Sequence, residues 1–144
     1  MELNYLNHEE FDLNPEGFSG YIEKLEQEIE TMEGILNVIF VNDTYIQALN
    51  KAYRGKDKPT DVLSFNYEEE RSDSDLGGEI YVSVETAERQ AKDHKHSFED
   101  ELIKLIVHGI LHVHGHDHEE EEDYKKMYAI ETLVLGKIAG PYAA

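Results

Sequence analysis

Apolar side chains in the first part of the chain predict two strands with a helix between them. The first strand lies near residues 2–6. The helix covers about residues 18–32, where apolar side chains recur at helical spacing and gather on one side. Residues 35–41 are a dense run of β-branched and aromatic side chains, which is typical of a central strand. We therefore expect a strand, a helix and a second strand in this order.

A second helix follows the run directly. Asn42 or Asp43 is suited to cap its first turn, because a short polar side chain can accept a hydrogen bond from a free backbone N–H. Gly55 ends this helix, since glycine readily takes the left-handed conformation that follows a last turn. Residues 61–67 then carry Val, Leu, Phe and Tyr among polar positions and predict a third strand.

The second half of the chain is mostly helical. Gly78 opens one more strand, over residues 79–83, in which apolar and polar positions alternate. Helices follow at about residues 84–95, after Ser97, and at about residues 119–138. The pattern predicts an α+β fold with a small mixed sheet of three or four strands, covered by about five helices.

Length and composition indicate one domain over residues 1–144, with no internal repeat. The chain has no cysteine, so a metal must bind to histidine or carboxylate. The amino-terminal residues have neither the basic region nor the apolar run of a signal peptide, and no apolar stretch is long enough to span a membrane. We expect a cytoplasmic protein with no membrane partner.

The chain is strongly acidic, with 13 Lys and Arg against 32 Asp and Glu and a formal net charge of −19. This charge repels phosphate backbones at long range and by itself argues against a nucleic-acid partner. Four cations nevertheless gather within one short segment, at Lys51, Arg54, Lys56 and Lys58. The segment is either a polar loop or a basic patch that can guide a phosphate group.

Histidines are concentrated in the segment that follows Val107. Three of them have the spacing H-x-x-x-H-x-x-G-x-x-H, as His108, His112 and His118. On a helix the first two rise by about 6 Å with little rotation, so that both imidazoles face one side. Gly115 lets the helix end and the chain reverse toward a third ligand. The spacing predicts a three-histidine metal site on a C-terminal helix and the turn after it, with one coordination position open for catalysis.

Two features around these histidines bear on that interpretation. The segment before them is rich in Leu, Ile and Val, which favours a buried helix over a solvated, metal-binding surface tract. Gly109 stands where a metalloprotease of similar spacing has the glutamate that acts as its general base. The site therefore suits a reaction whose base comes from elsewhere.

Three blocks of sequence together resemble one protein family. They are YRGKDKPTDVLSF, which contains Arg54, LGGEIYVS, which contains Gly78, and the histidine run HGILHVHGHDH. In this order they closely resemble the YbeY family of bacterial endoribonucleases, over about residues 41–135. The histidine run is the most specific of the three.

The resemblance implies a metal-dependent endoribonuclease that prefers single strands. Such an enzyme acts in 16S ribosomal RNA 3′-end maturation and in ribosome quality control, with ribosomal RNA, the small subunit and assembly factors as its partners. It also implies that His108, His112 and His118 bind one zinc ion, and that Arg54 is the basic residue needed for activity. Either water or the RNA 2′-hydroxyl can be the nucleophile, and the sequence does not choose between them.

Two other functions remain open at this point. One is a zincin-like hydrolase of peptides or small molecules, against which Gly109 counts. The other is a non-enzymatic ribosome-assembly protein, in which a structural zinc ion ties the last two helices together. A structural site needs a fourth protein ligand, such as Asp117 or Glu119, whereas a catalytic site keeps a position open.

Overall fold

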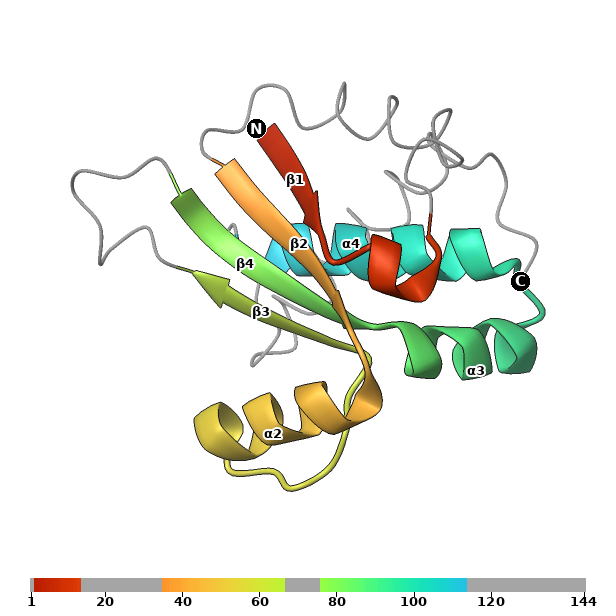
Figure 1. Ribbon diagram of the computed structural model, residues 1–144, viewed down its shortest axis with the longest axis horizontal. Helices are drawn as coiled ribbons and strands as arrows, with labels where there is room; N and C mark the ends of the chain where they lie inside the picture. Colours follow the sequence, from red (N-terminus) through yellow and green to blue (C-terminus); the bar gives the residue numbers. More distant parts are fainter. Residues whose placement is uncertain (1, 14–34, 67–75, 114–144) are drawn as a thin grey trace, which may run out of the picture.

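The computed structural model describes residues 2–13, 35–66 and 76–113, and it contains a four-stranded mixed sheet (Figure 1). The spatial order is β1-β2-β4-β3. The pairs β1–β2 and β2–β4 are parallel, and β3–β4 is antiparallel. The strands are β1 (Glu2–Leu6), β2 (Ile35–Val41), β3 (Val62–Asn66) and β4 (Leu76–Ser83). The predicted α+β fold with a small mixed sheet is confirmed.

Three α-helices and one 3-10 turn accompany the sheet within the described residues. They are η1 (Glu9–Phe11), α2 (Asp43–Arg54), α3 (Val84–His94) and α4 (Phe98–Val113). The predicted helices at about residues 18–32 and 119–138 lie outside the described residues. None of the described helices combines the length and the apolar composition needed to cross a membrane.

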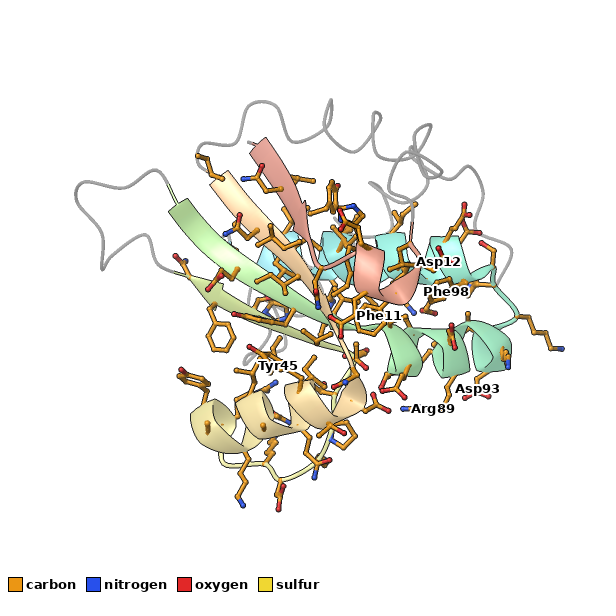
Figure 2. The ribbon with its side chains drawn as sticks, viewed as in Figure 1. Phe11, Asp12, Tyr45, Arg89, Asp93 and Phe98 are labelled. Atoms are coloured by element: carbon orange, nitrogen blue, oxygen red, sulfur yellow. The ribbon has the colours of Figure 1, made fainter. Side chains whose placement is uncertain are left out.

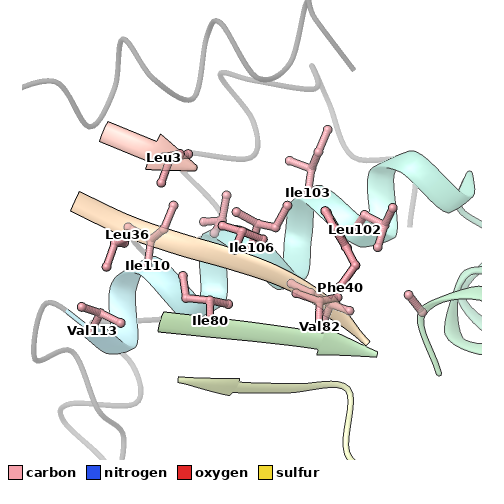
Figure 3. Close-up of a cluster of buried hydrophobic side chains, with 14 of the residues drawn as sticks. Leu3, Leu36, Phe40, Ile80, Val82, Leu102, Ile103, Ile106, Ile110 and Val113 are labelled. Carbon is pink, nitrogen blue, oxygen red and sulfur yellow. The ribbon is translucent and has the colours of Figure 1, made fainter. Parts of the chain in front are cut away.

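The larger apolar core lies between α4 and one face of the sheet (Figure 3). Alternate side chains of β2 and β4 point into it because successive residues of a strand face opposite sides. They meet the apolar side of α4, whose residues recur at helical spacing. The main contributors are Leu36, Val38, Phe40, Ile80, Val82, Leu102, Ile103, Ile106 and Ile110. This burial confirms that the histidine-bearing helix is a core element.

The opposite face of the sheet carries a smaller cluster under α2. Val41, Ile46 and Leu63 are buried there. Phe65 and Tyr81 pack against them but remain partly exposed. This face is therefore less completely covered than the α4 face in the described part of the chain.

Local signals locate the helix ends well. The Asn42 side chain accepts a hydrogen bond of 2.8 Å from the Tyr45 backbone N–H at the start of α2. Gly55 ends that helix with φ of +71°. Ser97 accepts a bond of 3.1 Å from the Asp100 backbone at the start of α4.

One predicted boundary is wrong. The strand expected to open at Gly78 begins two positions earlier, at Leu76, because Leu76 pairs with Ile35 of β2. The register shifts between Ile35 and Leu36, so that Leu36 pairs with Gly78. This irregularity accommodates an extra residue that alternation alone does not reveal.

Candidate active site

His108 and His112 meet on the last turns of α4. Their Nε2 atoms lie 3.0 Å apart, and their ring centroids are 4.5 Å apart. Both side chains are half-buried, and both line one cavity. The predicted convergence of these two imidazoles on one side of the helix is therefore observed.

The geometry of this pair fits two ligands of one metal ion. Two nitrogens bound to zinc at about 2.0–2.1 Å, at a tetrahedral angle, are separated by about 3.3 Å. The observed separation of 3.0 Å needs little adjustment to reach that value. Among residues 2–13, 35–66 and 76–113, no three His, Cys, Asp or Glu side chains gather to hold a metal. His118 lies outside the described residues, so the three-histidine site stays a prediction.

Close packing against the sheet sets the orientation of α4. A Cβ atom added at Gly109 would lie 2.6 Å from Cγ2 of Ile80, whose side chain is fully buried. The glycine therefore lets the helix approach β4 closely, while its neighbour His108 lines the cavity. A glutamate at position 109 would be directed into this contact. The absence of a metalloprotease base here has a packing reason, which weighs against the zincin-like alternative.

A hydrogen bond and a second glycine bring α4 against β3. The Asn66 side-chain amide donates a bond of 2.7 Å to the Val113 carbonyl at the end of the helix. A Cβ at Gly78 would clash with the Phe65 carbonyl oxygen and would lie 3.0 Å from a Val113 methyl group. Gly78 thus lets β3 and the end of α4 lie close together beside the histidines.

Arg54 lies across the cavity from α4, at the end of α2. The cavity has a volume of about 380 Å³ and opens to the surface. Its lining residues are Tyr53, Arg54, Thr60, Asp61, Val62, Leu63, Ser64, Phe65, His108 and His112. The structure therefore brings together the arginine and two of the three histidines that the sequence singled out.

A second cavity of about 500 Å³ continues from Arg54. Lys56, Lys58 and Arg89 contribute to its lining. Lys51 lines neither cavity, and its ammonium group lies 3.8 Å from an Asp57 carboxylate oxygen. Of the predicted basic segment, Arg54, Lys56 and Lys58 therefore line the candidate site or the cavity next to it, whereas Lys51 does not.

Polar bonds hold the start of α2 against α3. The Asp43 carboxylate accepts bonds from the Ser83 and Thr86 hydroxyls at 2.6 and 2.7 Å, and from Arg89 at 2.9 Å. Burial alone would raise the pKa of Asp43, but these bonds and the Arg89 charge outweigh it and lower the pKa below its usual value. Figure 2 shows Arg89 of α3 beside the start of α2. The ionised carboxylate fixes this end of the helix.

Sequence reasoning did not single out Tyr53, Asp61 and Phe65 as cavity residues. The Asp61 carboxylate accepts bonds from the Val62 backbone at 2.8 Å and from the Gln90 side chain at 3.3 Å, so it is held in place. The signal for Tyr53 was its position next to Arg54. For Asp61 and Phe65, the signal was their place within the block YRGKDKPTDVLSF, which also contains Arg54.

An aromatic row crosses the less covered face of the sheet toward the cavity. Tyr45 stacks on Tyr81, which contacts Phe65, which in turn contacts Tyr53. Burial is the main cause that raises the pKa of Tyr81 to about 12, and the nearby charge of Glu79 adds to it. Tyr81 therefore stays protonated and uncharged within the row at neutral pH.

Comparison with known proteins places this chain in a family. The family model described as Endoribonuclease YbeY matches residues 6–139. A protein named Endoribonuclease YbeY from Desulfitobacterium hafniense is 48% identical over 76% of this chain and 74% of its own length. The protein of that name from Acholeplasma laidlawii is 39% identical over 95% of this chain and 96% of its own.

A solved structure extends the likeness to the fold. The solution structure of a protein from Thermotoga maritima superimposes with a TM-score of 0.63 and is 32% identical to this chain. The match covers 96% of this chain and 87% of that one. With a family model that matches nearly the whole sequence, and with relatives this similar over most of their length, the chain belongs to the YbeY family.

Proposed function

We propose that the protein is a metal-dependent endoribonuclease that cleaves single-stranded RNA in the cavity between α2 and α4. One observation carries the proposal, namely that Arg54, His108 and His112 line the same cavity. Membership in a family whose proteins are named endoribonucleases supports the reaction class. We further propose ribosomal RNA at the 16S 3′ end as the substrate, with a role in ribosome quality control, on the basis of the sequence blocks that the family shares.

In this proposal His108, His112 and His118 hold one zinc ion. When bound, zinc supplies a Lewis acid that stabilises charge on a phosphoryl oxygen. The two histidines on α4 have their Nε2 atoms 3.0 Å apart, and close packing at Gly109 fixes the backbone that carries them against β4. This preorganisation lowers the cost of bringing the ligands to one point.

Arg54 is proposed to bind the phosphate that reacts. A guanidinium group can donate two hydrogen bonds to one phosphate and stays charged at any physiological pH. Its helix ends at Gly55 and is tied at its other end by Asp43, so the arginine is placed at the cavity wall by its backbone. Charge developing on the phosphoryl oxygens is stabilised by such a prepositioned donor.

The nucleophile is a separate question with a direct test. Attack by the RNA 2′-hydroxyl leaves a cyclic phosphate end, whereas attack by water leaves a linear one. Analysis of the new ends distinguishes them, and a cyclic phosphate product would exclude water as the attacking group.

Cleavage assays test the proposal as a whole. We expect purified protein to cleave single-stranded ribosomal RNA, to stop when a chelator is added, and to recover with zinc. His112→Ala and Arg54→Ala should each lower kcat by about 100-fold or more, because each removes stabilisation of transition-state charge. Lys51→Ala is the matched control, since this cation on the same helix lines neither cavity and should retain wild-type activity.

Metal removal separates a catalytic from a structural metal site. We expect chelated protein to keep its circular dichroism spectrum and most of its thermal stability while it loses activity. Unfolding on chelation, with refolding on zinc addition, would instead support the structural alternative. Metal-loaded, folded protein that cleaves neither free RNA nor RNA within small subunits would contradict the proposed function.

A further inference from the structure

We propose that Tyr53 and Phe65 form a stacking platform for one unpaired nucleobase at the mouth of the histidine cavity. The proposal rests on the proposed endoribonuclease function and adds a site for the base beside the sites for phosphate and metal. In this proposal the enzyme prefers single-stranded RNA because only an unpaired base can present its face to this aromatic surface.

Tyr53 combines an exposed aromatic ring with a place in the lining of the cavity. It lies in the last turn of α2, and 69% of its surface is exposed. It nevertheless lines the cavity that contains His108 and His112. An exposed ring that lines a cavity offers a flat apolar surface to a ligand within it.

The ring of Tyr53 is supported by contact with the ring of Phe65. Its centroid lies 5.2 Å from that of Phe65 at an interplanar angle of 71°, which is a favourable edge contact. Phe65 in turn meets Tyr81 at 5.8 Å and 86°. Because Tyr81 belongs to β4 inside the sheet, the platform is anchored to the core of the fold. A preorganised ring loses little conformational entropy on binding.

The charges around the platform match a nucleotide. Arg54 follows Tyr53 directly and lines the same cavity, and Lys56 and Lys58 line the cavity that continues from it. Cations along a groove with an aromatic side chain beside them are the usual means of binding single-stranded nucleic acid. The chain has a net charge of −19, so a cluster of cations beside an aromatic ring is better explained by a phosphate-bearing ligand than by a general protein-docking patch.

Tryptophan fluorescence gives a direct test, because the chain contains no tryptophan. Tyr53→Trp places one indole on the platform, and its emission should be quenched on titration with a single-stranded oligodeoxyadenylate, which an endoribonuclease does not cleave. The same oligonucleotide in a duplex should quench much less.

Tyr45→Trp is the matched control. Tyr45 lies on the same helix and is 52% exposed, but it lines a different cavity, toward η1. Its emission should not change with either probe.

Binding and kinetics complete the test. Tyr53→Ala should weaken binding of the single-stranded probe by about tenfold, while Tyr53→Phe should bind like wild type. In cleavage of single-stranded RNA, Tyr53→Ala should raise KM more than it lowers kcat.

The outcomes separate this inference from the proposed function. If wild type cleaves RNA but Tyr53→Trp is not quenched and Tyr53→Ala binds as wild type, the platform is not a base site and the endoribonuclease proposal stands. That result would also be the one expected if the aromatic surface bound a protein. If wild type binds no single strands and cleaves RNA neither free nor within small subunits, both proposals are overturned.

Discussion

The two helices that contribute to the cavity are held by different forces. Helix α4 is fixed mainly by apolar burial, with Leu102, Ile106 and Ile110 packed against the sheet and Gly109 in close contact with Ile80. Such packing does not depend on pH or on single hydrogen bonds. The histidines are therefore attached to the best-packed helix of the described fold.

Helix α2 relies more on directional polar contacts at its ends. Asn42 caps its first turn, and Asp43 gathers bonds from Ser83, Thr86 and Arg89. Its buried apolar contribution is small by comparison, with Ile46 as the main core side chain. The metal side of the cavity is therefore set mainly by the core, whereas the phosphate side is set by a few polar bonds that substitutions and pH can change.

Removing core volume under α4 should have the largest effect on stability. Ile106 is fully buried, and Ile106→Ala should lower the free energy of unfolding by about 2–5 kcal/mol because it leaves a cavity. Urea denaturation measures this loss. Glu99→Ala, at an exposed site on the same helix, should change it by less than about 0.5 kcal/mol. Equal losses for the two variants would show that core packing does not dominate.

Gly109→Ala tests the close contact between α4 and β4. Alanine favours a helix over glycine by about 1 kcal/mol, but the added methyl group would meet Ile80. We expect a net destabilisation of about 1–3 kcal/mol. In a double-mutant cycle, Gly109→Ala should become neutral or stabilising when Ile80→Ala removes the clash. Additive effects would contradict the proposed contact.

Asp43→Asn tests the polar anchoring of α2. At neutral pH the substitution should cost about 1 kcal/mol, because the ion pair with Arg89 and part of the hydrogen bonding are lost. The folded pKa of Asp43 is lowered, so its contribution is complete above the unfolded value of 3.8 and disappears as pH falls through the lower folded pKa.

The stability difference between wild type and Asp43→Asn should therefore shrink as pH falls below about 4. Asp93→Asn, at an exposed carboxylate of α3, is the control and should show little difference at any pH. A difference for Asp43→Asn that grows toward acid would have the wrong sign for this account.

Lys51→Ala should have the smallest effect. Its ion pair with Asp57 is long, at 3.8 Å, and both side chains are well exposed. Pairs of this kind contribute about 0–1 kcal/mol, so we expect a change near the lower limit of that range in thermal denaturation. A large loss would mean that α2 depends on surface charge along its length as well as at its start.

Local rules recovered much of the fold. The cap at Asn42, the helix end at Gly55 and the limits of β2 depend on neighbouring residues, and the structure confirms them. The start of β4 depends on pairing between Leu76 and Ile35, which are distant in sequence, and alternation could not reveal it. The cavity could not be predicted from local sequence either, because Arg54 comes near the histidines only through the tertiary arrangement.

Burial of a charged residue was also beyond sequence reasoning. Glu101 has 0% exposed surface on the otherwise apolar side of α4. Its carboxylate accepts a bond of 2.8 Å from His94 of α3, and Lys104 lies 3.7 Å away. Buried charges need such partners, and the contact with His94 depends on how α3 packs against α4. The Leu, Ile and Val content of the segment predicted a buried helix but gave no sign of the contact between Glu101 and His94.

The position of α4 in the chain also matters during synthesis. The strands that it covers, β2 and β4, leave the ribosome before it does, and their inward side chains include Leu36, Phe40 and Ile80. Until residue 113 has emerged, these side chains have no α4 to pack against, so an incomplete chain presents apolar strands that are prone to aggregation. The helix that shields them is also the helix that carries His108 and His112. A nascent chain therefore gains its histidine pair together with the helix that covers these strands, and products truncated before α4 should be both prone to aggregation and inactive.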